Sequence, residues 1–226
     1  MIRFRDIAQR VYPYSTFRIQ SNLSAEGGLS AKRSVLCQQA KPAVYLTFDD
    51  GPIPEVTPEV LAILERYGVK ATFFMVGENI DKHPEVFEQV IRAGHSIGNH
   101  TYNHLKGWRT PFENYLANVQ LWEEVANSQQ LIANSHLMRP PYGKATLRQR
   151  IALHRLGYRL IYWDILTRDY ESTRTPEAML AQIKREVRPG SIINFHDSLK
   201  SNERMLAVLP QAIEWLQKQG YELKAL

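Results

Sequence analysis

The chain alternates between two patterns of apolar and polar residues from residue 41 to residue 226. Short apolar and β-branched runs indicate strands, and longer segments with apolar residues every three or four positions indicate helices. The predicted strands are 43–48, 69–76, 95–99, 136–138, 158–163, 191–195 and 221–226. The predicted helices are 57–68, 83–94, 111–131, 145–157, 175–190 and 202–220. This alternation predicts an α/β protein with a parallel sheet.

The predicted strands are apolar on both faces, as expected when helices cover a parallel sheet. Periodicity alone leaves two architectures open, a doubly wound open sheet and a closed or distorted (β/α) barrel. We expect one domain over 41–226, because a chain of 226 residues suits a single large domain. Residues 1–40 are irregular in pattern, and the Ser- and Gly-rich stretch 21–34 predicts an N-terminal extension or linker of uncertain structure.

Polar side chains that can take part in catalysis or metal binding follow one predicted strand after another. Because the carboxyl ends of parallel strands meet at the same edge of a sheet, these side chains are expected to converge. They are Asp49 and Asp50, Asn99 and His100, Arg139 with Tyr142, Asp164 and Asp169, and His196 with Asp197. The pattern therefore predicts one site at the carboxyl ends of the strands.

The first strand ends in the sequence YLTFDDGP, which places Asp49 and Asp50 side by side. Two adjacent carboxylates repel each other unless a cation or a proton lies between them or beside them. The alternative interpretation is an Asp-rich turn with solvated charges. A bound cation would make the pair tolerable, with one aspartate as its ligand and the other free to act as a general base.

The sequence HTYNH supplies two further candidate ligands, His100 and His104. If this piece forms one helical turn, both imidazoles lie on one face and can share an ion. Together with one carboxylate they make a two-histidine, one-carboxylate set that leaves positions open for water. This set does not choose among Zn, Fe, Co and Ni.

Five segments in this order, TFDDGP, HTYNH, RPPYG, WDILTRDY and INFHDS, resemble the motifs of the polysaccharide deacetylase family, which is carbohydrate esterase family four with the NodB-homology domain. The resemblance covers roughly 41–226. It implies a distorted (β/α)7-type barrel and a metal-dependent hydrolase that removes N-acetyl, sometimes O-acetyl, groups from amino-sugar polymers, oligomers or precursors. The implied partner is an N-acetylated sugar, and the implied cofactor is one divalent ion, with Zn as first choice.

By the same resemblance, the metal ligands would be Asp50, His100 and His104. Asp49 would be the general base, and Arg139 would pair with it to keep it ionised and oriented.

The remaining implied roles fall to residues of the later motifs. Tyr142 would offer its backbone N–H to the developing oxyanion. His196 would be the general acid that protonates the departing nitrogen, and Asp169 would orient it.

Two positions depart from the family pattern. Tyr170 follows Asp169 where the family typically has Trp, and Asn194 stands two residues before His196 where an apolar side chain is usual. In the family these two positions, with the tyrosine of the RPPYG motif, line the pocket for the acetyl methyl group. A hydroxyl and an amide there predict a more polar acyl pocket, which a comparison of acetyl, formyl and glycolyl amides would test.

Composition narrows the class of partner. The formal charge is +5 with scattered Lys and Arg residues, so no nucleic-acid arm is predicted. The single cysteine, Cys37, excludes an intrachain disulfide and a thiolate-based zinc site. No apolar run is long enough for a membrane helix or a signal peptide, so the expected location is cytoplasmic by default.

Two other functions remain open on the residues alone. One is a non-catalytic carbohydrate-binding relative on the same fold. The other is a cyclic-amide or purine-ring hydrolase on a related barrel, which a short pocket closed by the N-terminal segment would favour.

Overall fold

The computed structural model describes residues 15–16, 41–128 and 136–226. The strands in these ranges form one sheet in which the paired strands run parallel. The strands are β1 (Ser15–Thr16), β2 (Ala43–Asp49), β3 (Thr72–Met75), β4 (Ser96–Asn99), β5 (Leu137–Met138), β6 (Arg159–Ile161), β7 (Ile165–Leu166), β8 (Ile192–His196) and β9 (Glu222–Lys224).

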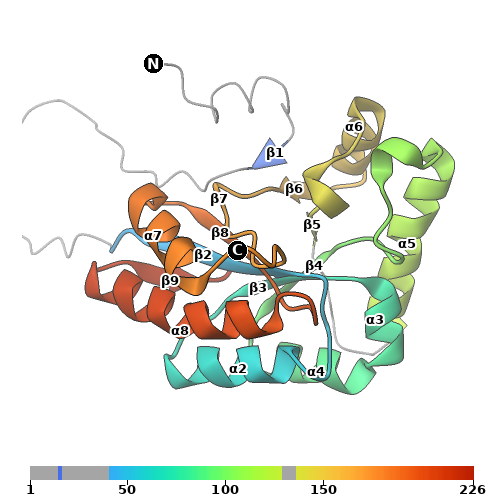
Figure 1. The fold of residues 1–226 in the computed structure, drawn as a ribbon. Helices are drawn as coiled ribbons and strands as arrows, with labels where there is room; N and C mark the ends of the chain where they lie inside the picture. Colours follow the sequence, from blue (N-terminus) through green and yellow to red (C-terminus); the bar gives the residue numbers. More distant parts are fainter. Residues whose placement is uncertain (1–14, 17–40, 129–135) are drawn as a thin grey trace, which may run out of the picture.

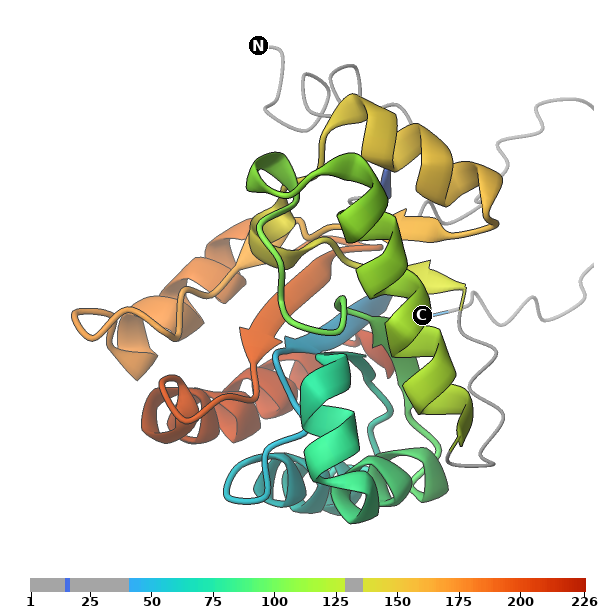
Figure 2. The same cartoon turned by 90° about the vertical axis from the view of Figure 1, so that its right-hand side faces the viewer.

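Helices alternate with these strands and lie outside the curve of the sheet (Figures 1 and 2). Helices α2, α4 and α8 lie along one side of the sheet, and α5 and α6 lie toward its other end. The helices are α2 (Thr57–Arg66), α3 (Gly77–Lys82), α4 (Pro84–Arg92), α5 (Phe112–Ser128), α6 (Leu147–Arg155), α7 (Pro176–Glu186) and α8 (Asn202–Lys218). None of the described helices is both long and apolar enough to cross a bilayer.

The strand order is β1-β6-β5-β4-β3-β2-β8-β7, with β9 paired to the beginning of β2. Strands β6 and β7 follow each other in the chain but stand near opposite ends of this order, and no pairing joins them within the described ranges. The sheet therefore curls into a half-barrel rather than a closed cylinder. The prediction of a distorted (β/α)7-type barrel is confirmed, and the open doubly wound sheet is excluded.

Side chains of β2 divide between the barrel interior and the helix layer because successive residues of a strand point to opposite faces. Phe48 packs into the core between sheet and helices, with its ring 5.0 Å from Phe73 and 5.7 Å from Phe195. Thr47 and Asp49 therefore face the other way, into the barrel. The candidate base thus projects from a strand that is fixed by core packing on its opposite face.

Most predicted elements lie within one to four residues of the observed ones. The predictions missed helix α3 and strand β7, and the predicted strand 158–163 corresponds to β6 alone. The predicted helix 111–131 is α5 as far as Ser128, and its last positions lie outside the described residues. The same holds for Cys37 and for the predicted linker 1–40, apart from β1, which pairs with β6.

Candidate metal centre and active site

The turn after β2 places Asp50 at the mouth of the barrel. Asp50 has a φ of 85°, and the Gly51–Pro52 peptide that follows is cis. The buried carboxylate of Asp197 accepts hydrogen bonds from the Gly51 N–H (3.1 Å) and from the Thr57 hydroxyl (2.7 Å). A Cβ atom at position 51 would lie 2.1 Å from the Asp197 carboxylate, so only glycine fits this contact. Asp197, to which the sequence assigned no role, therefore anchors the turn.

The loop after β4 brings the two histidines together without a helix. The expected helical turn in HTYNH is wrong, because Thr101 and His104 both have left-handed backbone angles, with φ of 63° and 53°. Asn118 of α5 holds the loop by accepting hydrogen bonds from the backbone N–H groups of Tyr102 (2.9 Å) and Asn103 (3.0 Å). The two imidazoles therefore meet because of a compact turn that is hydrogen-bonded to α5, and not because they share one face of a helix.

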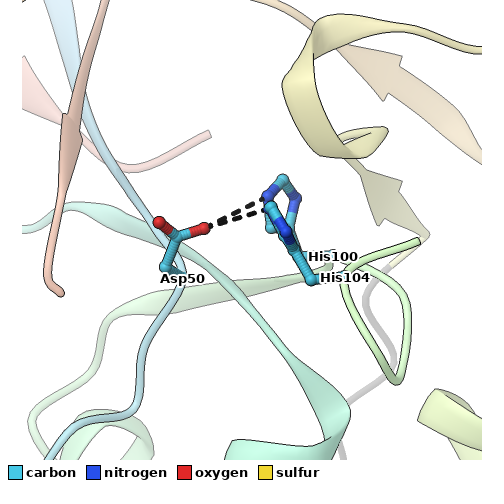
Figure 3. Close-up of side chains that lie close together, drawn as sticks. All are labelled: Asp50, His100 and His104. Atoms are coloured by element: carbon cyan, nitrogen blue, oxygen red, sulfur yellow. Dashed lines mark ion pairs between the residues drawn. The ribbon is translucent and has the colours of Figure 1, made fainter. Parts of the chain in front are cut away.

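Asp50, His100 and His104 form a cluster suited to a metal ion (Figure 3). The Asp50 Oδ1 atom lies 3.3 Å from His104 Nε2 and 3.7 Å from His100 Nε2. One ligand atom from each residue lies within 4.8 Å of the others. The His100 Nδ1–H donates to the Arg139 carbonyl oxygen at 2.7 Å, which leaves the lone pair of Nε2 facing Asp50.

The charge state of His100 also suits a ligand. Burial lowers the pKa of His100 to about 4, so the imidazole is neutral at pH 7. Neutral imidazole and carboxylate are donors that divalent transition metals accept. The donor set therefore fits a divalent cation.

Asp49 lies beside this cluster and is bound on both oxygens. Its Oδ1 accepts from Arg139 Nη1 at 2.6 Å, and its Oδ2 accepts from Asn194 Nδ2 at 3.0 Å. Burial by itself would raise the pKa of Asp49, but the neighbouring positive charges, Arg139 first, outweigh it and hold the pKa below its ordinary value. Asp49 is therefore an ionised carboxylate that is only 3% exposed.

Arg139 reaches Asp49 from the far side of the half-barrel. Its side chain is fully buried, and its Nε and Nη2 groups donate to the carbonyl oxygens of Ile161 (3.2 Å) and Tyr162 (3.1 Å). These carbonyls belong to the end of β6 and the connection to β7, where the sheet is not closed by strand pairing. The guanidinium thus joins the two sides of the barrel and orients Asp49 at the same time.

His196, at the end of β8, is paired with a buried carboxylate. Its Nδ1 lies 2.7 Å from Asp169 Oδ1, and its backbone N–H donates to Asp169 Oδ2 at 2.8 Å. Burial alone would lower the pKa of His196, but the hydrogen bond and charge of Asp169 outweigh it and raise the pKa to about 9. His196 is therefore protonated at neutral pH and presents Nε2–H as a proton donor.

These groups share one pocket of about 460 Å³. The lining residues are Asp49, Asp50, His100, His104, Tyr142, Trp163, Leu166, Tyr170, His196, Ser198 and Lys200. Of the ten candidate site residues singled out from the sequence, seven line this pocket, and Arg139 and Asp169 lie directly behind Asp49 and His196.

Tyr142 and Tyr170 lie at the pocket wall. Tyr142 has a φ of 60°, and its ring lies 4.7 Å from His104 and 5.5 Å from the exposed Trp108. The ring of Tyr170 stands edge-on to His196 at 4.9 Å. Both tyrosines therefore form part of the pocket wall.

Asn194 is not among the lining residues. Its side chain is fully buried beneath the pocket and contacts Asp49 and Arg139. Conversely, the sequence did not single out Trp163, Leu166 or Lys200, which do line the pocket. Their position at or beyond the ends of β6, β7 and β8 was the available signal, but an isolated Trp, Leu or Lys is not distinctive.

Comparisons with known proteins identify the family to which this chain is similar. The polysaccharide deacetylase family model matches residues 38–161. A chitooligosaccharide deacetylase from Azorhizobium caulinodans is 31% identical over 207 residues, covering 83% of this chain and 94% of the relative. A peptidoglycan-N-acetylglucosamine deacetylase from Bacillus cereus is 30% identical over 184 residues, covering 79% of this chain and 83% of the relative.

A solved structure shows the same fold at similar sequence identity. The crystal structure of a peptidoglycan N-acetylglucosamine deacetylase superimposes with a TM-score of 0.79 and 30% identity, covering 83% of this chain and 87% of the other. The match of the family model over more than half of the chain, together with these relatives, establishes the family. This chain belongs to the polysaccharide deacetylase family.

Proposed function

We propose that this protein is a metal-dependent hydrolase that removes N-acetyl groups from an amino-sugar polymer, oligomer or precursor. Family membership and the names of the relatives, which are chitooligosaccharide and peptidoglycan N-acetylglucosamine deacetylases, support the reaction class. The observation that carries the proposal is that one pocket holds a metal-ligand cluster, an ionised carboxylate and a protonated histidine.

Asp50, His100 and His104 would hold one divalent cation, with Zn as first choice and Fe, Co or Ni as alternatives. When bound, such an ion supplies Lewis-acid chemistry, which polarises a carbonyl group and lowers the pKa of a water molecule.

Asp49 is the general base of the proposed reaction. It is ionised at neutral pH, and Arg139 and Asn194 donate hydrogen bonds to its two oxygens, so it can take a proton from the attacking water. The water oxygen forms a bond to the amide carbon, which becomes tetrahedral and develops negative charge on its oxygen. The Tyr142 backbone N–H is the group of this chain that we assign to that oxygen.

His196 completes the reaction as general acid. An amide nitrogen leaves only when it is protonated, and His196 is held in its protonated form by Asp169. As the C–N bond breaks, the proton passes from His196 to the nitrogen, and the products are acetate and a free amine. The proton that Asp49 took balances the one that His196 gave.

The acyl group of the substrate is acetyl in this proposal. Of the two polar departures from the family pattern, the amide of Asn194 is bound within the protein and does not reach the pocket. Tyr170 alone adds a polar group to the wall. Trp163 and Leu166 supply apolar surface beside it for a methyl group.

Two alternatives lack a comparable observation. A non-catalytic sugar-binding protein has no need for the base, the ligand cluster and the acid together in one pocket. A pocket closed by the N-terminal segment would favour a cyclic-amide or purine-ring hydrolase, and residues 1–14 and 17–40 lie outside the described ranges.

Acetate release from a panel of N-acetylated oligosaccharides tests the proposal. We expect release by the zinc-loaded protein, a loss of at least about 100-fold after treatment with a chelator, and recovery when Zn²⁺ is added back. Formyl and glycolyl amides in the same panel test the acyl group. Release that a chelator does not reduce, or sugar binding without release on any substrate, would contradict the proposed function.

A further inference from the structure

Asn194 lies at the centre of a buried polar cluster beneath the pocket. It is fully buried on β8, and the strand register places it opposite Thr47 while His196, two residues on, lies opposite Asp49. Because residues two apart on a strand share a face, Asn194 points into the barrel on the same side as His196. It therefore lies one layer below the catalytic groups proposed above.

The hydrogen bonds of Asn194 determine which way its amide points. Arg139 Nη1 can only donate, so the atom that faces it must be the amide oxygen, Oδ1. The Thr47 hydroxyl lies 3.1 Å from the same oxygen. The amide nitrogen, Nδ2, must then face Asp49 Oδ2, to which it donates at 3.0 Å. No other orientation satisfies both Arg139 and Asp49.

The two oxygens of Asp49 are thus held by two different donors. Arg139 holds Oδ1 and Asn194 holds Oδ2, while Arg139 also binds Asn194. Two hydrogen bonds to the two oxygens of a carboxylate fix its plane, whereas a single bond leaves it free to rotate about the Cβ–Cγ bond. An apolar side chain at position 194, the usual residue in the family pattern, would leave Oδ2 without this partner.

We propose that Asn194 is a positioning residue that fixes the plane of the Asp49 carboxylate. The role of Asn194 then differs from the expected one, because its amide serves the base and does not select the acyl group. This inference rests on the proposed function, in which Asp49 is the general base. Asn194 does not touch the substrate, so its effect must reach the reaction through Asp49.

The substitution Asn194→Leu removes the donor and keeps a side chain of similar size. We expect kcat to fall about 10- to 100-fold with KM within about twofold, because the base is misoriented while the pocket wall is unchanged. Asn194→Ser provides a second variant that adds no bulk, with the same direction expected. Asn194→Asp should lower kcat further, since it places a second carboxylate or a competing proton against Asp49.

Thr72→Val is the matched control. Thr72 is also fully buried and lies on β3, but its hydroxyl accepts from the Leu226 N–H at 2.9 Å, and the hydrogen bonds of the described residues do not join it to Asp49. This variant should lower the unfolding temperature while it leaves kcat within about twofold. A purely structural role for Asn194 would give the Asn194 variants the same behaviour as Thr72→Val.

A crystal structure of metal-free Asn194→Leu gives a readout that needs no activity. We expect the Asp49 carboxylate to be rotated or in two conformers, with the Asp50, His100 and His104 side chains in place. A folded variant with unchanged kcat, a change in KM alone, or an unrotated Asp49 would overturn the inference. If the wild type released no acetate, the proposed function would fail, and the orientation of Asp49 in the two structures would still decide the positioning role.

Discussion

Two histidines that line the same pocket differ in charge at neutral pH: His100 is neutral and His196 is cationic. His100 faces a backbone carbonyl through Nδ1, and burial lowers its pKa to about 4. His196 faces the buried carboxylate of Asp169 through Nδ1, and this partner raises its pKa to about 9 against the effect of burial. The partner of one ring nitrogen thus decides whether the other nitrogen offers a lone pair or a proton.

The two neighbouring aspartates show a parallel division. Asp49 is 3% exposed and bound by Arg139 and Asn194, whereas the Asp50 side chain is 30% exposed and faces the two histidines. Adjacent residues on a strand end point in different directions, so the chain can place one carboxylate in the barrel and the other at its mouth. The candidate base and the candidate metal ligand therefore come from consecutive positions.

The largest expected effects come from exchanging each histidine for alanine. His100→Ala should abolish high-affinity binding of Zn²⁺, because a buried ligand is lost. Activity should therefore fall by about 1,000-fold or more. His196→Ala should lower kcat by about 100- to 10,000-fold while the zinc affinity stays within about threefold. Zinc titration and acetate release measured on both variants check this. An equal loss of zinc affinity in the two variants would contradict the assignment of His100 as metal ligand and His196 as general acid.

A smaller effect is expected from Asp169→Asn, which removes the negative charge beside His196. His196 donates a proton only when it is cationic, so wild-type kcat should fall as the pH rises through the pKa of His196. Without Asp169 that pKa drops, because only the smaller effects of the Asp50 and Asp49 charges then oppose burial, and the alkaline limb moves to lower pH. A bound cation lowers both values, so the shift between the two proteins is the quantity to measure.

The expected shift for Asp169→Asn is at least about one pH unit in the profile of kcat. The variant should therefore regain part of its activity at pH 6. The free energy of unfolding should also decrease as the pH rises. The His196–Asp169 pair contributes fully below the ordinary histidine pKa of about 6.5 and is lost as the pH rises through about 9. An alkaline limb that stays in place would show that another group donates the proton.

The smallest effect is expected from the anchor of the Asp50 turn. Asp197→Ala removes the acceptor for the Gly51 N–H and the Thr57 hydroxyl, so the turn loosens and zinc affinity should fall about 10-fold. Asp197→Asn keeps an acceptor for the Gly51 N–H, and a decrease of about threefold or less is expected. Competition with a chelator measures both affinities. An unchanged affinity in Asp197→Ala would mean that the turn holds its shape without this anchor.

The fold could be predicted from the sequence because strong local periodicities agree with the final structure. Segments such as 43–48 and 202–220 have the period of their element, and the helices end near Gly or begin near Pro. The missed helix α3 has only six residues, too few to show a repeat. Strand β7 has two residues, and its pairing with β8 is a tertiary contact.

The candidate site was predicted less completely, for a different reason. Asp49, Asp50, His100, His104 and His196 could be found because motifs at strand ends must meet at one edge of a parallel sheet. The shape of HTYNH could not be found, because Asn118 of a distant helix holds that loop in left-handed angles. Spacing alone suggested a helical turn that does not form.

The sequence by itself determined the alternating helices and strands, the barrel class and the identity of the charged side chains at the mouth of the barrel. The tertiary structure alone decided that His100 is neutral and His196 cationic, that Arg139 spans the open side of the barrel, and that Asn194 binds Asp49. These properties depend on strand register and burial. Asn194 and Asp49 are 145 residues apart in the chain, and only the pairing of β2 with β8 brings them into contact.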